Sequence, residues 1–444
     1  MQITKFYNEE YVHSALYQSF RSIGNYIDGM KVSARKIFYV VDKNNIKNEI
    51  KVSSLSSMVI NETEYLHGDV SLNGNVIGLA ANYIGSNNIN LLFPSGNFGS
   101  RFMGLDGAAA PRYIYTYKSR IFDYLFKKED TPILINQIFE GNYIEYKYYI
   151  PILPMILVNG NEGIGNGFSQ KIFPRDPKVI FSIMKSYLKN KKLPKEITPY
   201  FKGFIGSIFK TEKERQWAIH GKIEKINTYT IKITELPIGW KLNDYISQLN
   251  DLVENKIIKD YDDRSEDDKY EFIIKIDGEM GKKSEDELLT ILKLKSTFTE
   301  NFTCVDENNA IREFKSEIEI LEAYIKIRLE YYKKRKEYQL QTLKDEMKVL
   351  NNKALFIDNI INNVIFINNK PKSEIEKQLE TLKFDKVEDN YNYLLSMSIY
   401  SLTKEKYDEL KKQIKNKEDE FNKLLNMKIE DIWLNELNEL EKML

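Results

Sequence analysis

Hydrophobic side chains recur at helical spacing near the start of the chain. Steps of three or four residues, typical of an amphipathic helix, separate Val12, Leu16, Phe20 and Ile23. The dipeptide Asp28-Gly29 is a turn signal, and the run KVSARKIFYVV, residues 31–41, predicts a second amphipathic helix. We therefore expect residues 1–130 to form a compact mixed structure that opens with helices.

Residues 131–310 follow a different period, in which apolar and polar side chains alternate. The segments FIGSIFK, TYTIKITEL and YEFIIKID show this alternation, which is typical of half-buried strands. The acidic run YDDRSEDDKYE, residues 261–271, has the carboxylates of a metal cluster. Because alternating strands flank it, an exposed hairpin loop is the favoured interpretation. We expect a mixed α/β region here.

From about residue 311 the pattern becomes that of long helices without glycine. Apolar side chains return at three- and four-residue steps over residues 318–350 and again over 407–424, as in the seam of a coiled coil. These helices flank a shorter apolar-rich segment at about 354–400. We expect an antiparallel helix pair with a small module at its tip, and self-association is the simplest way to cover the module's apolar surface.

The segment GAAAPRYIYTYKSR, residues 107–120, contains tyrosines at alternating positions: Tyr113, Tyr115 and Tyr117. Alternation is typical of a strand with an aromatic face, and an arbitrary tyrosine is usually structural. A tyrosine beside a positive charge can also act as a nucleophile, and Arg112 directly precedes Tyr113. The preceding stretch, 91–107, is rich in Gly, Ser and Asn and predicts a loop.

Composition narrows the class of protein. A chain of 444 residues is long enough for several domains, since a domain commonly has ~100–200 residues. The sequence lacks a run of ~18 apolar residues, and acids stand where a signal peptide needs an apolar segment. We therefore expect a cytoplasmic protein without a membrane partner. The single cysteine, Cys304, excludes an internal disulfide, and three histidines make a zinc site hard to build.

Charge gives no overall sign of a nucleic-acid partner, because basic and acidic residues both number 65. Two local clusters are basic: the lysine-rich segment 170–195 and the group of Lys31, Arg35 and Lys36. Each cluster is either a surface for a polyanion or a solvated helix face. GEMGKKS, residues 278–284, has too few residues between its glycines to be a phosphate-binding P-loop, and no ATPase site is visible.

Longer motifs resemble one family. The stretch from YLHGDV to PRYIYT, residues 65–116, resembles the breakage–reunion core of type IIA DNA topoisomerases. YIDGMKVSARKIFYV, residues 26–40, and PILPMILVNGNEGIGNGFSQKI, residues 151–172, resemble the neighbouring blocks of that family in the same order. The motifs are closer to the eukaryotic branch than to bacterial gyrase. Because the first motif lies close to the initial methionine, the chain resembles the medium subunit of T-even-type bacteriophage topoisomerases.

The resemblance implies a multidomain α+β fold. Residues 1–130 would form a winged-helix domain for DNA cleavage, and residues 131–310 an α/β tower domain. Residues 311–444 would form a long antiparallel coiled coil, whose small helical module at about 354–400 would be the dimerisation gate.

The resemblance also implies roles for four residues at the reacting phosphate. Tyr113 matches the catalytic tyrosine, which would form a transient 5′-phosphotyrosyl link to DNA. Arg112 matches the arginine that stabilises charge on the phosphate, and His67 and Arg35 match further active-site positions. Adjacent side chains of a strand point to opposite faces, so either the backbone at Arg112 is irregular or its side chain reaches round.

Four further residues are implied to contact DNA outside the reacting phosphate. Ile164 matches the family's wedge isoleucine, which intercalates between base pairs and bends the duplex. Lys31, Lys36 and Lys171 are expected to hold the DNA backbone, which makes binding sensitive to salt.

The resemblance places the remaining chemistry on another chain. Mg²⁺ would be bound by acidic residues of a TOPRIM/ATPase large subunit, which would also use ATP, and no metal ligand is expected in this chain. The implied function is the DNA-cleaving and rejoining subunit of an ATP-dependent type IIA topoisomerase, a homodimer that relaxes or decatenates double-stranded DNA. The alternative is a catalytically silent dimeric scaffold that bends DNA.

Overall fold

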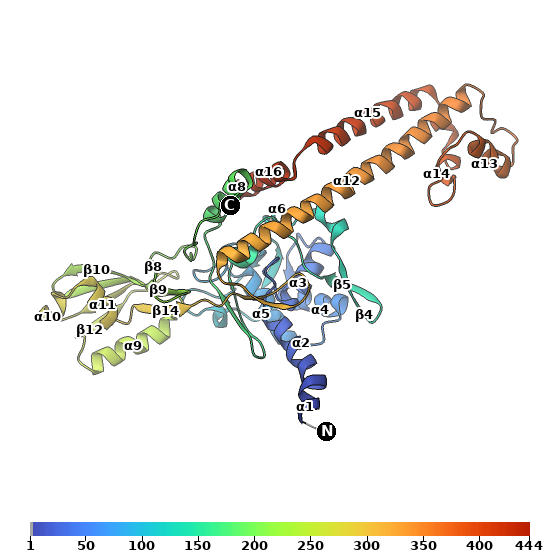
Figure 1. Ribbon diagram of the computed structural model, residues 1–444. Coiled ribbons are helices and arrows are strands. Elements are labelled where there is room, and N and C mark those ends of the chain that lie inside the picture. The colour runs from blue at the N-terminus through green and yellow to red at the C-terminus, as the bar shows by residue number, and fades with distance from the viewer. Residues whose placement is uncertain (1–2) are drawn as a thin grey trace. The chain divides into compact units, whose positions relative to one another are not determined.

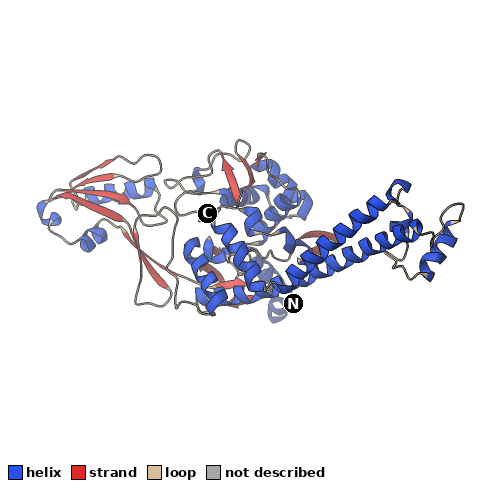
Figure 2. Cartoon of the chain, turned by 90° about the horizontal axis from the view of Figure 1, so that it is seen from above, coloured by secondary structure: helices blue, strands red, loops and turns tan. Residues whose placement is uncertain are grey.

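The computed structural model describes residues 3–444, which form two compact units (Figure 1). The first unit contains the residues up to Arg328 together with Leu434–Leu444, and the second is Leu329–Trp433. The fold mixes helices with small antiparallel sheets (Figure 2). Among the helices of residues 3–444, none has both the length and the apolar character needed to cross a bilayer.

Helices open the first unit, as their apolar spacing predicts. The first helical stretch comprises α1 (Ile3–Lys5), the π-helical η1 (Phe6–Tyr11) and α2 (Val12–Ser22), and it extends away from the body of the unit (Figure 1). The apolar stripe of α2 is therefore exposed at Val12 and Leu16, whereas Ile23, directly after the helix, is buried. Three further helices follow: α3 (Val32–Lys43), α4 (Val52–Thr63) and α5 (Asp69–Ala80).

A three-stranded antiparallel sheet packs with these helices in the order β1-β3-β2, with β1 at Ile50–Lys51, β2 at Leu92–Ser95 and β3 at Tyr115–Lys118. The expectation of a loop throughout 91–107 is wrong at its start, because Leu92 is buried and β2 pairs along β3. Tertiary pairing there outweighs the local turn composition. Tyr115 and Tyr117 lie in β3, and Tyr113 precedes it.

Two further sheets, one of four strands and one of three, follow farther along the first unit. One has the order β10-β11-β13-β12 and the other β14-β9-β8. Their bounds are β8 (Ser207–Lys210), β9 (Gln216–His220), β10 (Lys222–Asn227), β11 (Thr230–Glu235), β12 (Asp260–Asp263), β13 (Phe272–Lys275) and β14 (Lys295–Thr299). The alternating segments are strands as predicted. The acidic run lies largely in the β12–β13 hairpin, and its interpretation as a hairpin loop is confirmed.

Three two-stranded ribbons complete the strands of this unit: β4 (Asn136–Phe139) with β5 (Asn142–Tyr146), β6 (Asn161–Ile164) with β7 (Ser169–Ile172), and β15 (Thr303–Val305) with β16 (Ile311–Glu313). The remaining helices are η2 (Leu105–Gly107), α6 (Phe122–Leu125), η3 (Lys128–Ile133), α7 (Met155–Val158), α8 (Pro177–Asn190), α9 (Leu242–Glu254), α10 (Gly278–Gly281) and α11 (Glu285–Ile291). Cys304 is buried in β15, where Gln170 Nε2 lies 3.3 Å from its Sγ, and burial raises the pKa of its thiol to about 12.

The second unit contains the predicted helix pair. Helix α12 (Glu317–Ile361) continues into it from the first unit, and α15 (Lys404–Asn426) runs beside it before α16 (Ile429–Glu441) begins. Leu343, Leu410 and Ile414 of the predicted stripes are buried. The polar interruption at Lys417 is matched across the pair, because its Nζ lies 2.8 Å from Glu346 Oε2.

Between α12 and α15 lies the predicted small module, built from α13 (Lys372–Thr381), α14 (Asn392–Leu395) and η4 (Ile399–Ser401). Its core is formed by Phe356, Ile365, Leu379, Phe384, Tyr391 and Leu394. The module also leaves large apolar side chains in solvent: Leu355, Ile361, Val364, Phe366, Leu382 and Tyr400.

Candidate functional site

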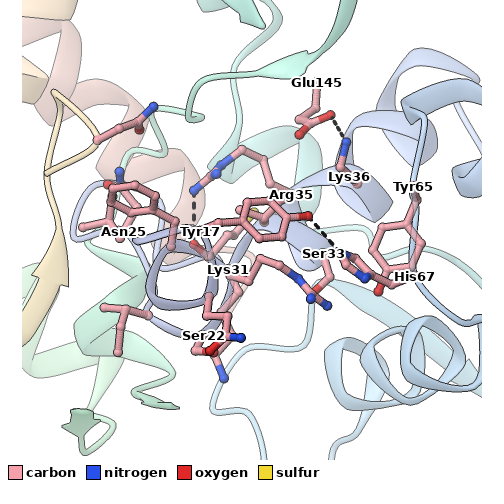
Figure 3. Close-up of a pocket in the computed structure, with 18 of the residues that line it drawn as sticks. Tyr17, Ser22, Asn25, Lys31, Ser33, Arg35, Lys36, Tyr65, His67 and Glu145 are labelled. Atoms are coloured by element: carbon pink, nitrogen blue, oxygen red, sulfur yellow. Dashed lines mark hydrogen bonds and ion pairs between the residues drawn. The ribbon is translucent and has the colours of Figure 1, made fainter. Parts of the chain in front are cut away.

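A cavity of about 960 Å³ in the first unit brings together five of the eight predicted site residues (Figure 3). Its walls come from α2, α3, the α4–α5 connection, β5 and the β6–β7 hairpin. The predicted residues that line it are Lys31, Arg35, Lys36, His67 and Ile164. Arg112, Tyr113 and Lys171 lie outside its lining.

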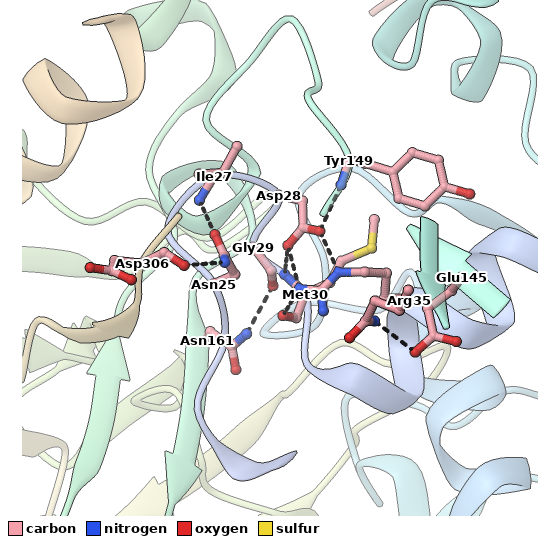
Figure 4. Close-up of polar contacts among 11 residues, drawn as sticks. Asn25, Ile27, Asp28, Gly29, Met30, Arg35, Glu145, Tyr149, Asn161 and Asp306 are labelled. Atoms are coloured by element: carbon pink, nitrogen blue, oxygen red, sulfur yellow. Dashed lines mark hydrogen bonds and ion pairs between the residues drawn. The ribbon is translucent and has the colours of Figure 1, made fainter. Parts of the chain in front are cut away.

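Arg35 lies in α3 and is held rigidly by Asp28 (Figure 4). Its Nε donates to Asp28 Oδ2 at 2.7 Å and its Nη2 to Asp28 Oδ1 at 3.1 Å, while the residue is only 5% exposed. Burial alone would lower the pKa of Arg35, but the Asp28 carboxylate outweighs it and the pKa is raised. Asp28 also accepts from the backbone N–H groups of Met30 and Tyr149. The guanidinium is therefore charged and fixed in position.

Lys36 is also buried and engaged within the protein. Its Nζ donates to Glu145 Oε2 at 2.8 Å and to the backbone carbonyl of Thr63 at 2.6 Å. A phosphate contact by Lys36 stays a prediction, and it requires the ammonium to leave or share Glu145. The sequence identifies Asp28 only as part of a turn. It does not identify Glu145 as the partner of Lys36, because a partner 109 positions away leaves no local signal.

Lys31 and Lys171 both converge on Glu162 at the base of the β6–β7 hairpin. Lys31 Nζ donates to the Glu162 carbonyl at 2.6 Å, and Lys171 Nζ lies 3.4 Å from Glu162 Oε1. Burial lowers the pKa of Lys31, and the Glu162 carboxylate partly opposes this effect. These lysines brace the hairpin through Glu162, and their contact with a DNA backbone remains a prediction.

Ile164 ends β6 at the tip of the hairpin, where its side chain is 82% exposed. The turn closes with a bond from Gly165 N–H to the Phe168 carbonyl at 2.8 Å. A Cβ added to Gly163 would lie 1.9 Å from the carbonyl oxygen of Ser22, so the glycine lets the hairpin pack directly against the end of α2. An exposed apolar tip on a fixed base has the form required of an intercalating wedge.

His67 lies in the short connection between α4 and α5, inside the cavity. Its Nε2 is 2.8 Å from the phenol oxygen of Tyr17 in α2, a contact drawn in Figure 3. The neighbouring Tyr65 ring forms a T-shaped contact with it, with ring centroids 5.4 Å apart. Burial, and to a lesser extent the charge of Arg21, lower the pKa of the imidazole. Sequence reasoning did not find Tyr17 at the site, because nothing in the spacing links residues 17 and 67.

Tyr113 lies in a turn at residues 111–113. The backbone at Arg112 is therefore irregular, which is the first of the two alternatives expected for this pair of adjacent residues. Its ring is 68% exposed, and the Arg112 guanidinium carbon lies 5.0 Å from the ring centroid. The turn is anchored to the start of α4, where Val52 N–H donates to the Ile114 carbonyl and Ser53 N–H to the Pro111 carbonyl. These bonds use amides that a helix start leaves free.

The described residues supply a phenol, an imidazole and fixed cations rather than a metal centre. Within residues 3–444, no group of three or more His, Cys, Asp or Glu side chains is arranged to hold a metal ion. An exposed phenol beside a guanidinium can attack an electrophile whose developing negative charge the cation stabilises.

Comparisons with known proteins assign this chain to a family. A family model for the A subunits of DNA gyrase and topoisomerase IV matches residues 21–438. The chain is 35% identical over 420 residues to the mitochondrial DNA topoisomerase 2 of Dictyostelium discoideum, covering 92% of this chain and 32% of that protein. It is 34% identical over 492 residues to DNA topoisomerase 2 of Acanthamoeba polyphaga mimivirus, covering 93% and 38% respectively. The chain thus spans about a third of the length of these curated relatives.

A solved structure agrees with the sequence comparisons. The crystal structure of the Plasmodium falciparum topoisomerase II DNA-binding, cleavage and re-ligation domain matches with a TM-score of 0.88 and 37% identity, covering 98% of this chain and 64% of that one. The resemblance to type IIA topoisomerases is confirmed, while the closer likeness to a bacteriophage subunit stays a prediction. The chain belongs to the family formed by the DNA gyrase and topoisomerase IV A subunits.

Proposed function

We propose that this chain cleaves and rejoins DNA as part of an ATP-dependent type IIA DNA topoisomerase. The exposed phenol of Tyr113, with the Arg112 guanidinium 5.0 Å from its ring centroid, is the observation that carries the proposal. A scaffold that only bends DNA does not require this pair. The match to a solved cleavage and re-ligation domain over 98% of the chain supports the same reaction.

Cleavage and rejoining at the phosphate need no external energy source, because the covalent link to tyrosine keeps the energy of the broken phosphodiester bond. The Tyr113 phenol gives its proton to water and its oxygen attacks phosphorus to form a P–O bond, the P–O3′ bond breaks, and the leaving 3′ oxygen takes up a proton from water. The product is a 5′-phosphotyrosyl link and a 3′-hydroxyl, and the reverse attack rejoins the strand. Arg112 stabilises the charge on the phosphate oxygens, and His67 donates a hydrogen bond to the same group.

The cavity and its hairpin form the proposed surface for the duplex that is cut. Ile164 inserts between base pairs and bends the duplex, while Lys31, Lys36 and Lys171 contact its backbone. Arg35 keeps a positive charge near the scissile phosphate because Asp28 fixes it. The order of elements supports a winged-helix domain at 1–130 and a tower domain at 131–310.

Two partners complete the proposal. A second copy of the chain binds through the module at 354–400, whose exposed Phe366 and Tyr400 need an apolar partner. The family resemblance implies a TOPRIM/ATPase large subunit that binds Mg²⁺ and uses ATP. Bound Mg²⁺ assists phosphate chemistry by neutralising charge. The assembly then passes a second duplex through the cut and relaxes or decatenates DNA.

Covalent capture tests the proposed function. The chain is mixed with a TOPRIM/ATPase partner, Mg²⁺ and supercoiled plasmid, then denatured, and protein-linked linear DNA is collected. We expect an adduct that maps to Tyr113, that is lost in Tyr113→Phe and that persists in the control Tyr117→Phe, whose ring is stacked on Phe93 in the sheet. A verified DNA-bound complex without an adduct would support the bending scaffold instead.

A further inference from the structure

The phenol of Tyr17 forms a hydrogen bond with the predicted active-site histidine, and neither the motifs nor the comparisons assign it a role. Tyr17 lies in α2, 50 residues before His67, and its oxygen is 2.8 Å from His67 Nε2 (Figure 3). Its ring is 52% exposed, so the contact is not forced by a packed core. The contact therefore depends on the hydrogen bond between two side chains on separate elements rather than on core packing.

The surroundings hold the imidazole by one nitrogen only. The Tyr65 ring packs against the His67 ring in a T-shaped contact, with an angle of 77° between the ring planes. Tyr17 occupies Nε2, while Nδ1 has no hydrogen-bond partner among the described residues. Nδ1 is therefore the nitrogen that can bond to a ligand entering the cavity.

The neutral imidazole allows two proton arrangements for this pair, and they differ at Nδ1, whereas a protonated imidazole would donate from both nitrogens. If Nε2 donates to the phenol, Nδ1 presents a lone pair, which repels a phosphate anion. If the phenol donates to Nε2, the proton of the neutral imidazole lies on Nδ1, which can then donate to a phosphate oxygen. Of the two neutral arrangements, only the second satisfies both bonds when the ligand is DNA.

Charge around the cavity favours the second arrangement. The Arg21 guanidinium carbon lies 5.8 Å from the centroid of the Tyr17 ring, where it favours the phenol as a donor. A cationic wall also favours the neutral imidazole, which is the form that accepts at Nε2. The charged side chains that line the cavity are Arg21, Lys31, Arg35, Lys36 and Lys147, with Glu64 and Glu145 as the acids.

We propose that Tyr17 is a positioning residue for His67: its phenol donates to Nε2, fixes the proton on Nδ1 and aims Nδ1–H at a phosphate oxygen of the bound DNA. This inference rests on the proposed function of His67 and deepens it. Tyr17 acts through the imidazole and does not touch the reacting atoms.

Nuclear magnetic resonance of ¹⁵N-labelled histidine tests the proton position in the intact chain. The chain has only three histidines, so substitution of each in turn assigns the signals. We expect the wild type to carry the His67 proton on Nδ1. Tyr17→Phe removes the donor, so the Nδ1–H form loses its excess and the His67 pKa rises. Tyr7→Phe is the matched control, since Tyr7 lies in the same helical stretch and is 53% exposed.

A kinetic measurement with the partner chain separates positioning from structure. In Tyr17→Phe we expect strand cleavage to slow about tenfold, as for a lost oriented contact, with DNA affinity unchanged and the acid limb of the pH profile moved to higher pH. A purely structural tyrosine would leave that limb where it is in the wild type.

The positioning role and the proposed function can be contradicted independently of each other. If the His67 proton in the wild type is on Nε2, or if Tyr17→Phe leaves its position unchanged, the positioning role is overturned even when covalent adducts form normally. If the proton moves as expected but the wild type forms no adduct, the Tyr17–His67 pairing stands, and both the proposed function and the catalytic purpose of the pairing are overturned.

Discussion

Arg35 and Tyr113 are both predicted to act on one phosphate, yet the structure holds them in opposite ways. Arg35 is 5% exposed and is bonded to Asp28 through two nitrogens. Tyr113 is 68% exposed, and its phenol has no hydrogen-bond partner among the described residues. The residues that line the cavity, together with Asp28 behind Arg35, are called the wall below, and they are fixed and already charged. The turn at residues 111–113 instead presents a nucleophile that must still be aligned. Substitutions in the wall should reduce stability, and substitutions in the turn should reduce reaction rate.

The largest effect is expected when the wall loses its buried carboxylate. Asp28→Ala leaves the Arg35 cation buried without a counter-charge, which should lower the free energy of unfolding by about 3–5 kcal/mol. Chemical denaturation measures it. Asp251→Ala, at an exposed position of α9, is the control and should stay within about 0.5 kcal/mol of the wild type. Equal stability of the two variants would contradict a fixed wall.

The turn should respond to substitution in the opposite sense. Arg112→Ala removes the guanidinium beside Tyr113, so strand cleavage by the complete complex should slow about 10²–10³-fold. Unfolding should change by less than about 1 kcal/mol, because the cation–π contact is exposed. Arg120→Ala, a second exposed arginine nearby, should leave the rate unchanged. A large loss of stability in Arg112→Ala would erase the contrast with Arg35.

The hairpin that carries Ile164 should behave as part of the wall. Gly163→Ala places a Cβ where it meets the Ser22 carbonyl, so we expect a destabilisation of about 1–3 kcal/mol and weaker bending of a doubly labelled duplex in fluorescence energy transfer. Gly74→Ala meets no atom within 4 Å in α5 and should stabilise the chain by about 0.4–1 kcal/mol. Normal bending in the destabilised Gly163→Ala would show that the hairpin base does not position Ile164.

The smallest expected effect is on the pH dependence of the chain's stability. The pKa of His67 is lowered in the folded chain, so the unfolded chain binds a proton first as pH falls through its ordinary value of about 6.5. The neutral imidazole therefore contributes stability above that pH, and the contribution is lost as pH falls through the folded value. His67→Gln should lose less stability than the wild type between about pH 7 and pH 5. An identical loss would show that His67 titrates alike in both states.

Local pattern was sufficient for much of the fold. Helical spacing predicted α2, α3 and the pair α12 and α15, because each buries or presents a stripe that repeats with the helix turn. Alternation predicted β8, β11 and β13. The strand β2 was missed because its pairing with β3 is formed over a long loop and local composition favours a turn.

The site was predictable only where a motif names the residue. Tyr113 and Ile164 are in motifs, and the structure places both in exposed positions suited to their predicted roles. Asp28, Glu145 and Tyr17 determine how Arg35, Lys36 and His67 are held. Glu145 and Tyr17 reach their partners from 109 and 50 positions away, where no spacing rule applies. Asp28 lies within a motif, but nothing in its turn signal shows that its carboxylate faces Arg35.

The buried thiol of Cys304 has a practical consequence for spectroscopy. The only cysteine of the chain is enclosed and its pKa is raised to about 12, so at neutral pH it should not react with maleimide reagents. The natural sequence is thus already a silent background for site-specific labelling. One cysteine introduced at exposed Tyr400 would carry a single probe per protomer, and the distance between the probes of two protomers would follow the opening of the proposed gate directly.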